Sequence, residues 1–167
     1  MRQFSTLSCV TALIIAATAG AATTATAFGP TATQQVDGVI VVAGSTCTWA
    51  NARTSANPPT ALSIDRTSIN KPGGSLSCTG GVTAALNNNP NVTFDDTAGY
   101  AKADVIDITG TQLGISCRYK ATNVLWDRDG TTRKYVNQAF TATKTSGSFL
   151  CPGSVTTAAG GSSLLFR

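Results

Sequence analysis

Residues 113–136, LGISCRYKATNVLWDRDGTTRKYV, are the stretch that decides the fold. Apolar and polar residues alternate on both sides of a central DRDG segment, and Asp-Gly is a strong signal for a hairpin turn. The pattern predicts two antiparallel strands joined by a turn at residues 127–130. The same four residues resemble the start of a calcium loop. The cations that follow them and the missing terminal carboxylate favour the turn.

The two faces of this predicted hairpin differ in character. A four-residue loop would place Trp126 opposite Thr131, and alternate residues of each strand would then share a face. We predict that the outer face is a cationic and aromatic binding surface formed by Arg118, Lys120, Trp126, Arg133 and Tyr135. The inner face, which we predict to pack in the core, contains Ile115, Cys117, Tyr119, Ala121, Leu125 and Val136. A β-bulge near Asn123 would instead turn Trp126 into the core.

Short alternating segments continue on both sides of the hairpin. Together they predict about ten to twelve short strands, separated by frequent turn signals. The expected strands outside the hairpin include residues 39–42, 61–66, 75–79, 82–86, 91–94, 105–108, 140–143, 149–151 and 164–166. Residues 70–74 and 109–110 are expected turns, and residues 100–104 are compatible with one helical turn. The pattern predicts an all-β fold, an antiparallel β-sandwich of immunoglobulin-like or related Greek-key type, with a small β-barrel as the alternative.

Four of the five cysteines lie beyond the N-terminal leader described below, namely Cys47, Cys78, Cys117 and Cys151. Their spacing is too wide for a C-x-x-C zinc or redox motif, so we expect two structural disulfides. Four cysteines allow three pairings. The pairs Cys47–Cys78 and Cys117–Cys151 are favoured, because each joins segments that are near in sequence.

Residues 1–27 have the features of a secretory signal peptide. Arg2 precedes an apolar run that is too short to span a bilayer, and an A-x-A cleavage pattern follows at residues 25–27. Cleavage there would remove Cys9 and leave residues 28–167 as a single secreted β-sandwich domain. We therefore expect an extracellular or cell-surface location, with no membrane partner after the leader is removed.

The composition excludes several kinds of catalytic centre. The chain has no histidine and no glutamate, and all eight of its acids are aspartates. Without histidine there is no Ser-His-Asp triad, no Cys–His pair and no imidazole metal ligand. Eleven cations and eight acids follow residue 27, and this weak positive field does not indicate a nucleic-acid partner. We expect no cofactor and no metal ion.

Paired carboxylates are the remaining basis for catalysis in this composition. The candidate pairs are Asp95 with Asp96 and Asp104 with Asp107. Adjacent residues of a strand point to opposite faces, and aspartate is common in turns, so a structural role is favoured over a hydrolase. Residues 91–93, NVT, match the N-glycosylation sequon, whose use depends on the host.

These observations lead to one functional expectation and two alternatives. We expect a non-catalytic, secreted binding protein whose partner is another protein or a cell-wall or extracellular polymer. The first alternative is a structural or assembly subunit of an extracellular fibre, in which the polar lead-in at residues 28–37 would be donated as a strand. The second, less favoured alternative is a carboxylate-based hydrolase.

Overall fold

A computed structural model of the chain describes residues 34–42, 44–69 and 76–167. These residues belong to a compact unit that extends from Thr31 to Arg167. The predicted leader with its cysteine and cleavage site, and the predicted turn at residues 70–74, lie outside the described residues.

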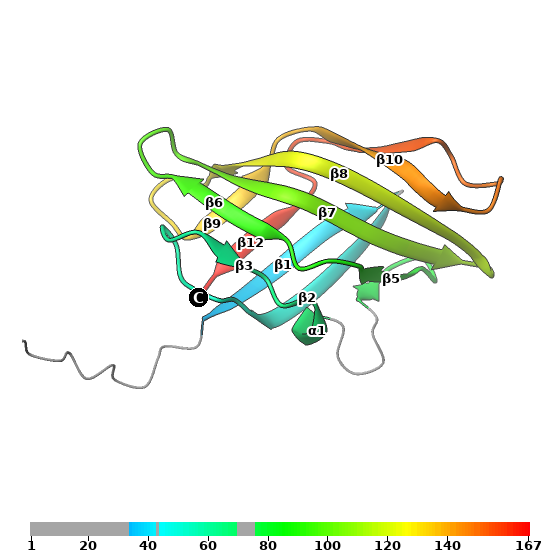
Figure 1. Ribbon diagram of the computed structural model, residues 1–167, viewed down its shortest axis with the longest axis horizontal. Coiled ribbons are helices and arrows are strands. Elements are labelled where there is room, and N and C mark those ends of the chain that lie inside the picture. Colours follow the sequence, from blue (N-terminus) through cyan, green and yellow to red (C-terminus); the bar gives the residue numbers. More distant parts are fainter. Residues whose placement is uncertain (1–33, 43, 70–75) are drawn as a thin grey trace, which may run out of the picture. The chain divides into compact units, whose positions relative to one another are not determined.

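The described part of the chain is all-β, as the sequence predicts, with one short helix (Figure 1). Its strands are β1 (Gln35–Val42), β2 (Ser45–Arg53), β3 (Leu62–Ser63), β4 (Ser77–Cys78), β5 (Thr83–Leu86), β6 (Asn91–Asp95), β7 (Tyr100–Gln112), β8 (Ile115–Arg128), β9 (Lys134–Asn137), β10 (Phe140–Gly147), β11 (Ser154–Thr157) and β12 (Ser163–Phe166). The helix α1 (Arg66–Ile69) was not predicted. Asp65 caps it, because its carboxylate accepts a hydrogen bond from the Thr67 amide at 2.9 Å.

The long hairpin of β7 and β8 is the central element of the sheet (Figure 1). One edge of β7 is shared by β6 and β5, and the opposite edge of the hairpin, on β8, is shared by β9 and β10. The strand order β3-β6-β7-β8-β9-β12-β1-β2-β4 is antiparallel throughout. Its end strands, β3 and β4, are not paired with each other in the described structure, so the sheet is open.

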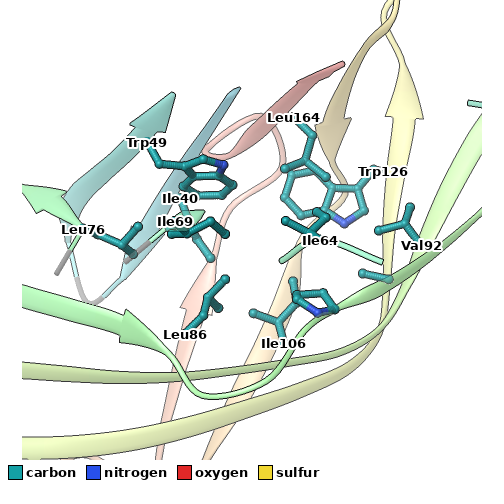
Figure 2. Close-up of a pocket in the computed structure, with 12 residues that line it drawn as sticks. Ile40, Trp49, Ile64, Ile69, Leu76, Leu86, Val92, Ile106, Trp126 and Leu164 are labelled. Atoms are coloured by element: carbon teal, nitrogen blue, oxygen red, sulfur yellow. The ribbon is translucent and has the colours of Figure 1, made fainter. Parts of the chain in front are cut away.

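Apolar side chains from distant parts of this sheet meet in one core. Ile40 of β1 and Leu164 of β12 lie with Val92 of β6, Ile106 of β7 and Trp126 of β8 around a small cavity (Figure 2). The volume of this cavity is about 30 Å³. Ligand pockets usually measure roughly 300–1,000 Å³, so this space is a packing defect and not a ligand site.

The inner and outer faces of the central hairpin exchange at Asn123. Asn123 has a φ of 52°, which lies in the left-handed region that asparagine tolerates. The pairing register is the same on both sides of it, with Ala103 opposite Val124 and Val105 opposite Thr122. Odd-numbered residues of β8 face the core before this point and even-numbered residues after it. Trp126 is therefore turned into the core.

Both favoured disulfides are confirmed. Cys47 on β2 is bonded to Cys78, which lies directly opposite on β4. Cys117 on β8 is bonded to Cys151, which follows β10. The first disulfide fastens an edge strand of two residues to the sheet, and the second fastens the segment after β10 to the central hairpin.

Three local predictions for the β7–β8 hairpin and the loop after it were wrong. Residues 100–104 belong to β7 and are not helical, because they pair with β6 and β8. The expected turn at residues 109–110 is also part of β7, and the chain turns instead at residues 113–114. Strand β8 continues through residue 128, so the next loop is residues 129–133 and not 127–130.

Candidate functional site

The predicted cationic and aromatic face does not form. The sequence predicts that Trp126 and Tyr135 lie on an exposed surface, but their side chains are buried, each with 2% of its surface exposed. The exchange of faces at Asn123 explains the burial of Trp126. The greater length of β8 explains the burial of Tyr135, because Tyr135 pairs with Arg128 and not with Thr122.

Tyr135 packs in an aromatic cluster of the core. Its ring centroid lies 5.4 Å from that of Phe94 and 5.8 Å from that of Phe166. Arg133 is half-buried in the loop before β9, whereas Arg118 and Lys120 are exposed near the other end of the β7–β8 hairpin. The five residues predicted to bind together are thus divided between the core and two ends of the hairpin.

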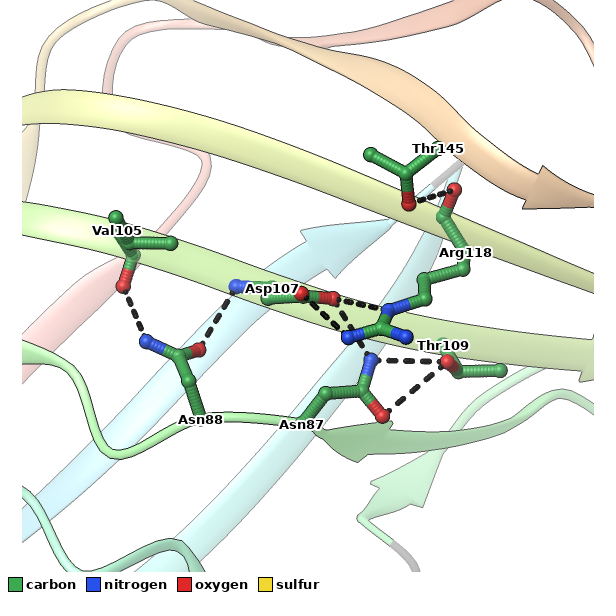
Figure 3. A network of polar contacts seen from close by, with 7 residues as sticks. All are labelled: Asn87, Asn88, Val105, Asp107, Thr109, Arg118 and Thr145. Carbon is green, nitrogen blue, oxygen red and sulfur yellow. Dashed lines mark hydrogen bonds and ion pairs between the residues drawn. The ribbon is translucent and has the colours of Figure 1, made fainter.

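Arg118 is held in a polar network on the outer side of β7 (Figure 3). Its guanidinium group donates two hydrogen bonds of 2.8 Å to the two carboxylate oxygens of Asp107. Asn87 donates a third at 2.8 Å. The hydrogen bonds from Arg118 outweigh burial and hold the pKa of Asp107 below its usual value. Asp107 is buried and Arg118 neutralises it, so the charge of Arg118 serves the fold.

The candidate carboxylates each have a local structural partner. Burial raises the pKa of Asp104, but hydrogen bonds from the side chain and backbone of Asn91 lower it more, so its pKa lies below the usual value. Asp95 accepts a hydrogen bond from the amide of Ala98 in the following turn. Asp96 forms an ion pair with Arg128 at 3.4 Å.

The sequon residue Asn91 is exposed, and its side-chain amide donates a hydrogen bond of 2.8 Å to Asp104.

The strongest surface feature is a group of three exposed apolar side chains, which we call the apolar tip: Leu113, Phe149 and Leu150. Their exposed fractions are 94%, 90% and 60%. They come from two turns, one between β7 and β8 and one between β10 and β11, which lie at the same end of the sheet (Figure 1). Taking about 200 Å² for a large side chain, the tip exposes on the order of 500 Å², near the upper limit for the largest patch on a typical monomer.

The first turn holds Leu113 in an unfavourable conformation. Leu113 and Gly114 form the two-residue turn of the hairpin, and both have positive φ angles, 49° and 79°. Turns of this kind favour Asn-Gly or Gly-Gly, because a branched side chain is strained in the left-handed region. Leucine is therefore disfavoured here both by backbone strain and by exposure to water.

The second turn presents Phe149 and Leu150 rigidly. The amide of Cys151 donates to the carbonyl of Ser148 at 3.1 Å, which closes a β-turn with the two apolar residues at its centre. The disulfide from Cys151 ties this turn to β8. Lys144 also donates hydrogen bonds to the carbonyl oxygens of Ser148 and Cys151, at 3.5 and 3.2 Å.

A shallow hollow of about 240 Å³ lies between the two turns, with Leu113 and Leu150 in its wall. Ile115, Tyr119 and Pro152 contribute to its floor and sides, and none of the described residues that line it is charged. The two turns therefore form one continuous uncharged surface.

Sequence reasoning missed the apolar tip for two local reasons. The alternation of apolar residues continues through Leu113 to Ile115, so the sequence predicts an earlier turn, at residues 109–110. Phe149 alternates with Cys151, so the pattern predicts a strand there. In the structure both residues belong to a β-turn. The combination of Leu-Gly at a hairpin turn with Phe-Leu beside a cysteine was the available signal.

Among the described residues, no group of three histidine, cysteine, aspartate or glutamate side chains is placed to hold a metal ion. The same part of the chain contains no helix with the length and apolar character needed to cross a membrane. The two disulfides indicate an oxidising environment. Comparisons with protein-family models, curated proteins and solved structures found no match to this chain.

Proposed function

We propose that this chain is a non-catalytic, secreted protein that acts by surface contact, and that the apolar tip is its contact surface. The observation that carries the proposal is Leu113, a strained and fully solvated leucine at a turn where asparagine or glycine would be more stable. Residues that weaken the fold and expose apolar surface are typical of binding sites.

The energetic scale is consistent with such a role. Transfer of one large apolar side chain from water is worth about 1.5–3 kcal/mol when it is fully buried. The three side chains of the apolar tip therefore offer roughly 4–7 kcal/mol before the cost of association. The disulfide at Cys151 and the bonds from Lys144 reduce that cost, because they fix the second turn before any partner arrives.

The proposed architecture is a β-sandwich related to Greek-key folds, which keeps the apolar tip on a rigid support. In support of it, side chains of β1 and β12 pack against those of β6, β7 and β8 in a shared core. Such packing of two parts of one open sheet is typical of sandwiches.

The two alternatives receive less support. In the strand-donation alternative residues 28–37 would pair with another subunit, but Val36 and Asp37 already pair with β12, and Gln35 and Val36 with β2. A carboxylate hydrolase needs a general acid whose pKa is raised. Asp104 and Asp107 both have lowered pKa values, which suits ion pairing better than proton donation.

The test measures binding to three defined surfaces: phospholipid vesicles, insoluble peptidoglycan and an apolar peptide on beads. The variant of the apolar tip carries Leu113→Asn, Phe149→Ser and Leu150→Ser together. The control is Leu165→Ser, which removes a leucine that is 39% exposed on β12. We expect the tip variant to lose binding to every surface that the unaltered protein binds, and the control to keep it. Retained binding by the folded tip variant, or no binding of the unaltered protein to any surface, would refute the proposal.

A further inference from the structure

We infer that the apolar tip docks on a lipid bilayer that contains anionic phospholipid. This inference rests on the proposed function, because it names the partner of the same surface. It replaces the expectation of no membrane partner, which considered only segments that could span a bilayer. Docking here means shallow insertion of the tip from one side.

The form of the apolar tip suits a bilayer. Leu113 and Phe149 are almost completely solvated, so they project from the two turns and are not recessed in a pocket. A bilayer interface accepts projecting side chains without a matching shape, to a depth of roughly 5–10 Å. No charged group of the hollow has to be buried, because the residues lining the hollow between the turns are uncharged among those described.

The distribution of charge favours an anionic surface. The segments that lead to the tip, residues 76–86, 106–121 and 140–157, contain three cations and a single acid. The acid is Asp107, which Arg118 neutralises. At the other end of the hairpin, residues 91–105 and 122–139 contain five acids and four cations. The end that carries the apolar tip is therefore the positive end.

Lys144 places a positive charge directly behind the apolar side chains. Its ammonium group donates hydrogen bonds to the carbonyl oxygens of Ser148 and Cys151, which begin and end the turn that presents Phe149 and Leu150. Insertion of those two side chains would bring this ammonium group to the level of the phosphates. A cation at that depth is attracted by anionic lipid, whereas an apolar protein partner gains nothing from it.

The expected binding is weak and reversible. A single myristoyl chain gives membrane association of about 10⁴ M⁻¹, and three inserted side chains offer apolar transfer of the same order. The loss of one large anchor should weaken binding about tenfold to a hundredfold. The loss of one nearby cation should weaken binding to anionic vesicles about fivefold and leave neutral vesicles unaffected.

The test is co-sedimentation of the protein, as purified from cells that express it, with two kinds of vesicle. One kind contains phosphatidylcholine alone, and the other also contains about 30 mol % phosphatidylglycerol. We compare Phe149→Ser, Leu113→Asn and Lys120→Gln with the control Leu165→Ser. Lys120 is exposed on β8, where it pairs with Thr143 beside Lys144, and the hydrogen bonds of the second turn come from other residues. Each variant must first show the same circular dichroism spectrum as the unaltered protein. Its melting temperature must be no lower than that of the control variant.

We expect the anionic vesicles to bind more protein than the neutral ones, and we expect binding to decrease as the salt concentration rises from about 0.1 M to about 0.5 M. Phe149→Ser and Leu113→Asn should weaken binding to both kinds of vesicle. Lys120→Gln should weaken binding to the anionic vesicles only, and Leu165→Ser should change binding to neither kind. Equal binding by the tip variants and the unaltered protein would overturn the inference. If the protein binds peptidoglycan or the apolar peptide through the tip but not vesicles, the lipid inference fails while the proposed function stands.

Discussion

Replacing Leu113 by asparagine should stabilise the protein while it weakens the proposed contact. Leu113 lies in the left-handed region, with a φ of 49°, and 94% of its surface is exposed. Asparagine is one of the residues that hairpin turns with positive φ favour, and Asn-Gly would replace Leu-Gly without a change in turn length. Most substitutions destabilise a protein, so the direction of this effect is a demanding prediction.

The magnitude follows from two terms. A bulky residue in the left-handed region costs about 1–2 kcal/mol, of which asparagine recovers a part. The packing lost is small because Leu113 is nearly fully solvated. We expect the free energy of unfolding to rise by about 0.5–1.5 kcal/mol, which corresponds to an increase in melting temperature of roughly 2–5 °C for a unit of this size.

The assay is urea unfolding followed by circular dichroism, with calorimetry for the melting temperature. Leu165→Asn is the matched control, because Leu165 is exposed on a strand with an ordinary backbone and asparagine is disfavoured there. We expect the control to be neutral or destabilising. A loss of stability above about 0.5 kcal/mol for Leu113→Asn would show that Leu113 supports the fold, and the inference from its strain would then be wrong.

Three further predictions concern the supports of the sheet. Asp107→Ala should lower the free energy of unfolding by about 2–3 kcal/mol at pH 7, measured by urea unfolding, since it removes the acceptor of three hydrogen bonds. The pKa of Asp107 is lowered in the folded state, so the part of this stabilisation that depends on its charge is fully present above the unfolded value of about 3.8 and is lost as the pH falls through the folded-state pKa. A difference between the two proteins that does not shrink as the pH is lowered through this range would contradict this. Gly38→Ala should cost about 2–4 kcal/mol, because a Cβ would lie 1.9 Å from the Trp49 ring, and a normal melting curve would contradict that packing. Replacing Cys117 and Cys151 by alanine should cost about 3–4 kcal/mol and weaken vesicle binding further than the stability loss explains, whereas intact binding would show that a rigid second turn is not needed.

The all-β fold and both disulfides could be predicted from the sequence, because they depend on signals that are local or nearly so. Alternation of apolar residues marks strands, and cysteines about 30 residues apart suit neighbouring strands. The exchange of faces at Asn123 could not be predicted in the same way. Asparagine tolerates a φ of 52° as well as ordinary strand angles, so its identity does not decide between them, and the burial of Trp126 follows from that choice.

The apolar tip could not be predicted from the sequence pattern, because its residues depart from the usual residue preferences of turns. A turn is expected to contain glycine, asparagine or other polar residues, so Leu113 and Phe149 were assigned to strands. Consistency between local preference and fold is the usual sign of a stable element, and its failure is common at functional sites. Leu113 and Phe149, where the turn preferences fail, are two of the three side chains that the proposed contact uses.

The most direct test of the contact surface is the fluorescence of a Phe149→Trp variant on anionic vesicles. We predict that the emission of the added tryptophan shifts to shorter wavelength and is strongly quenched by lipids brominated on their acyl chains, because residue 149 would lie below the phosphates. A Leu165→Trp variant, with its probe on β12, should show neither change. Bound protein in which the probe at 149 stays unquenched, or in which the probe at 165 is quenched more, would contradict the account.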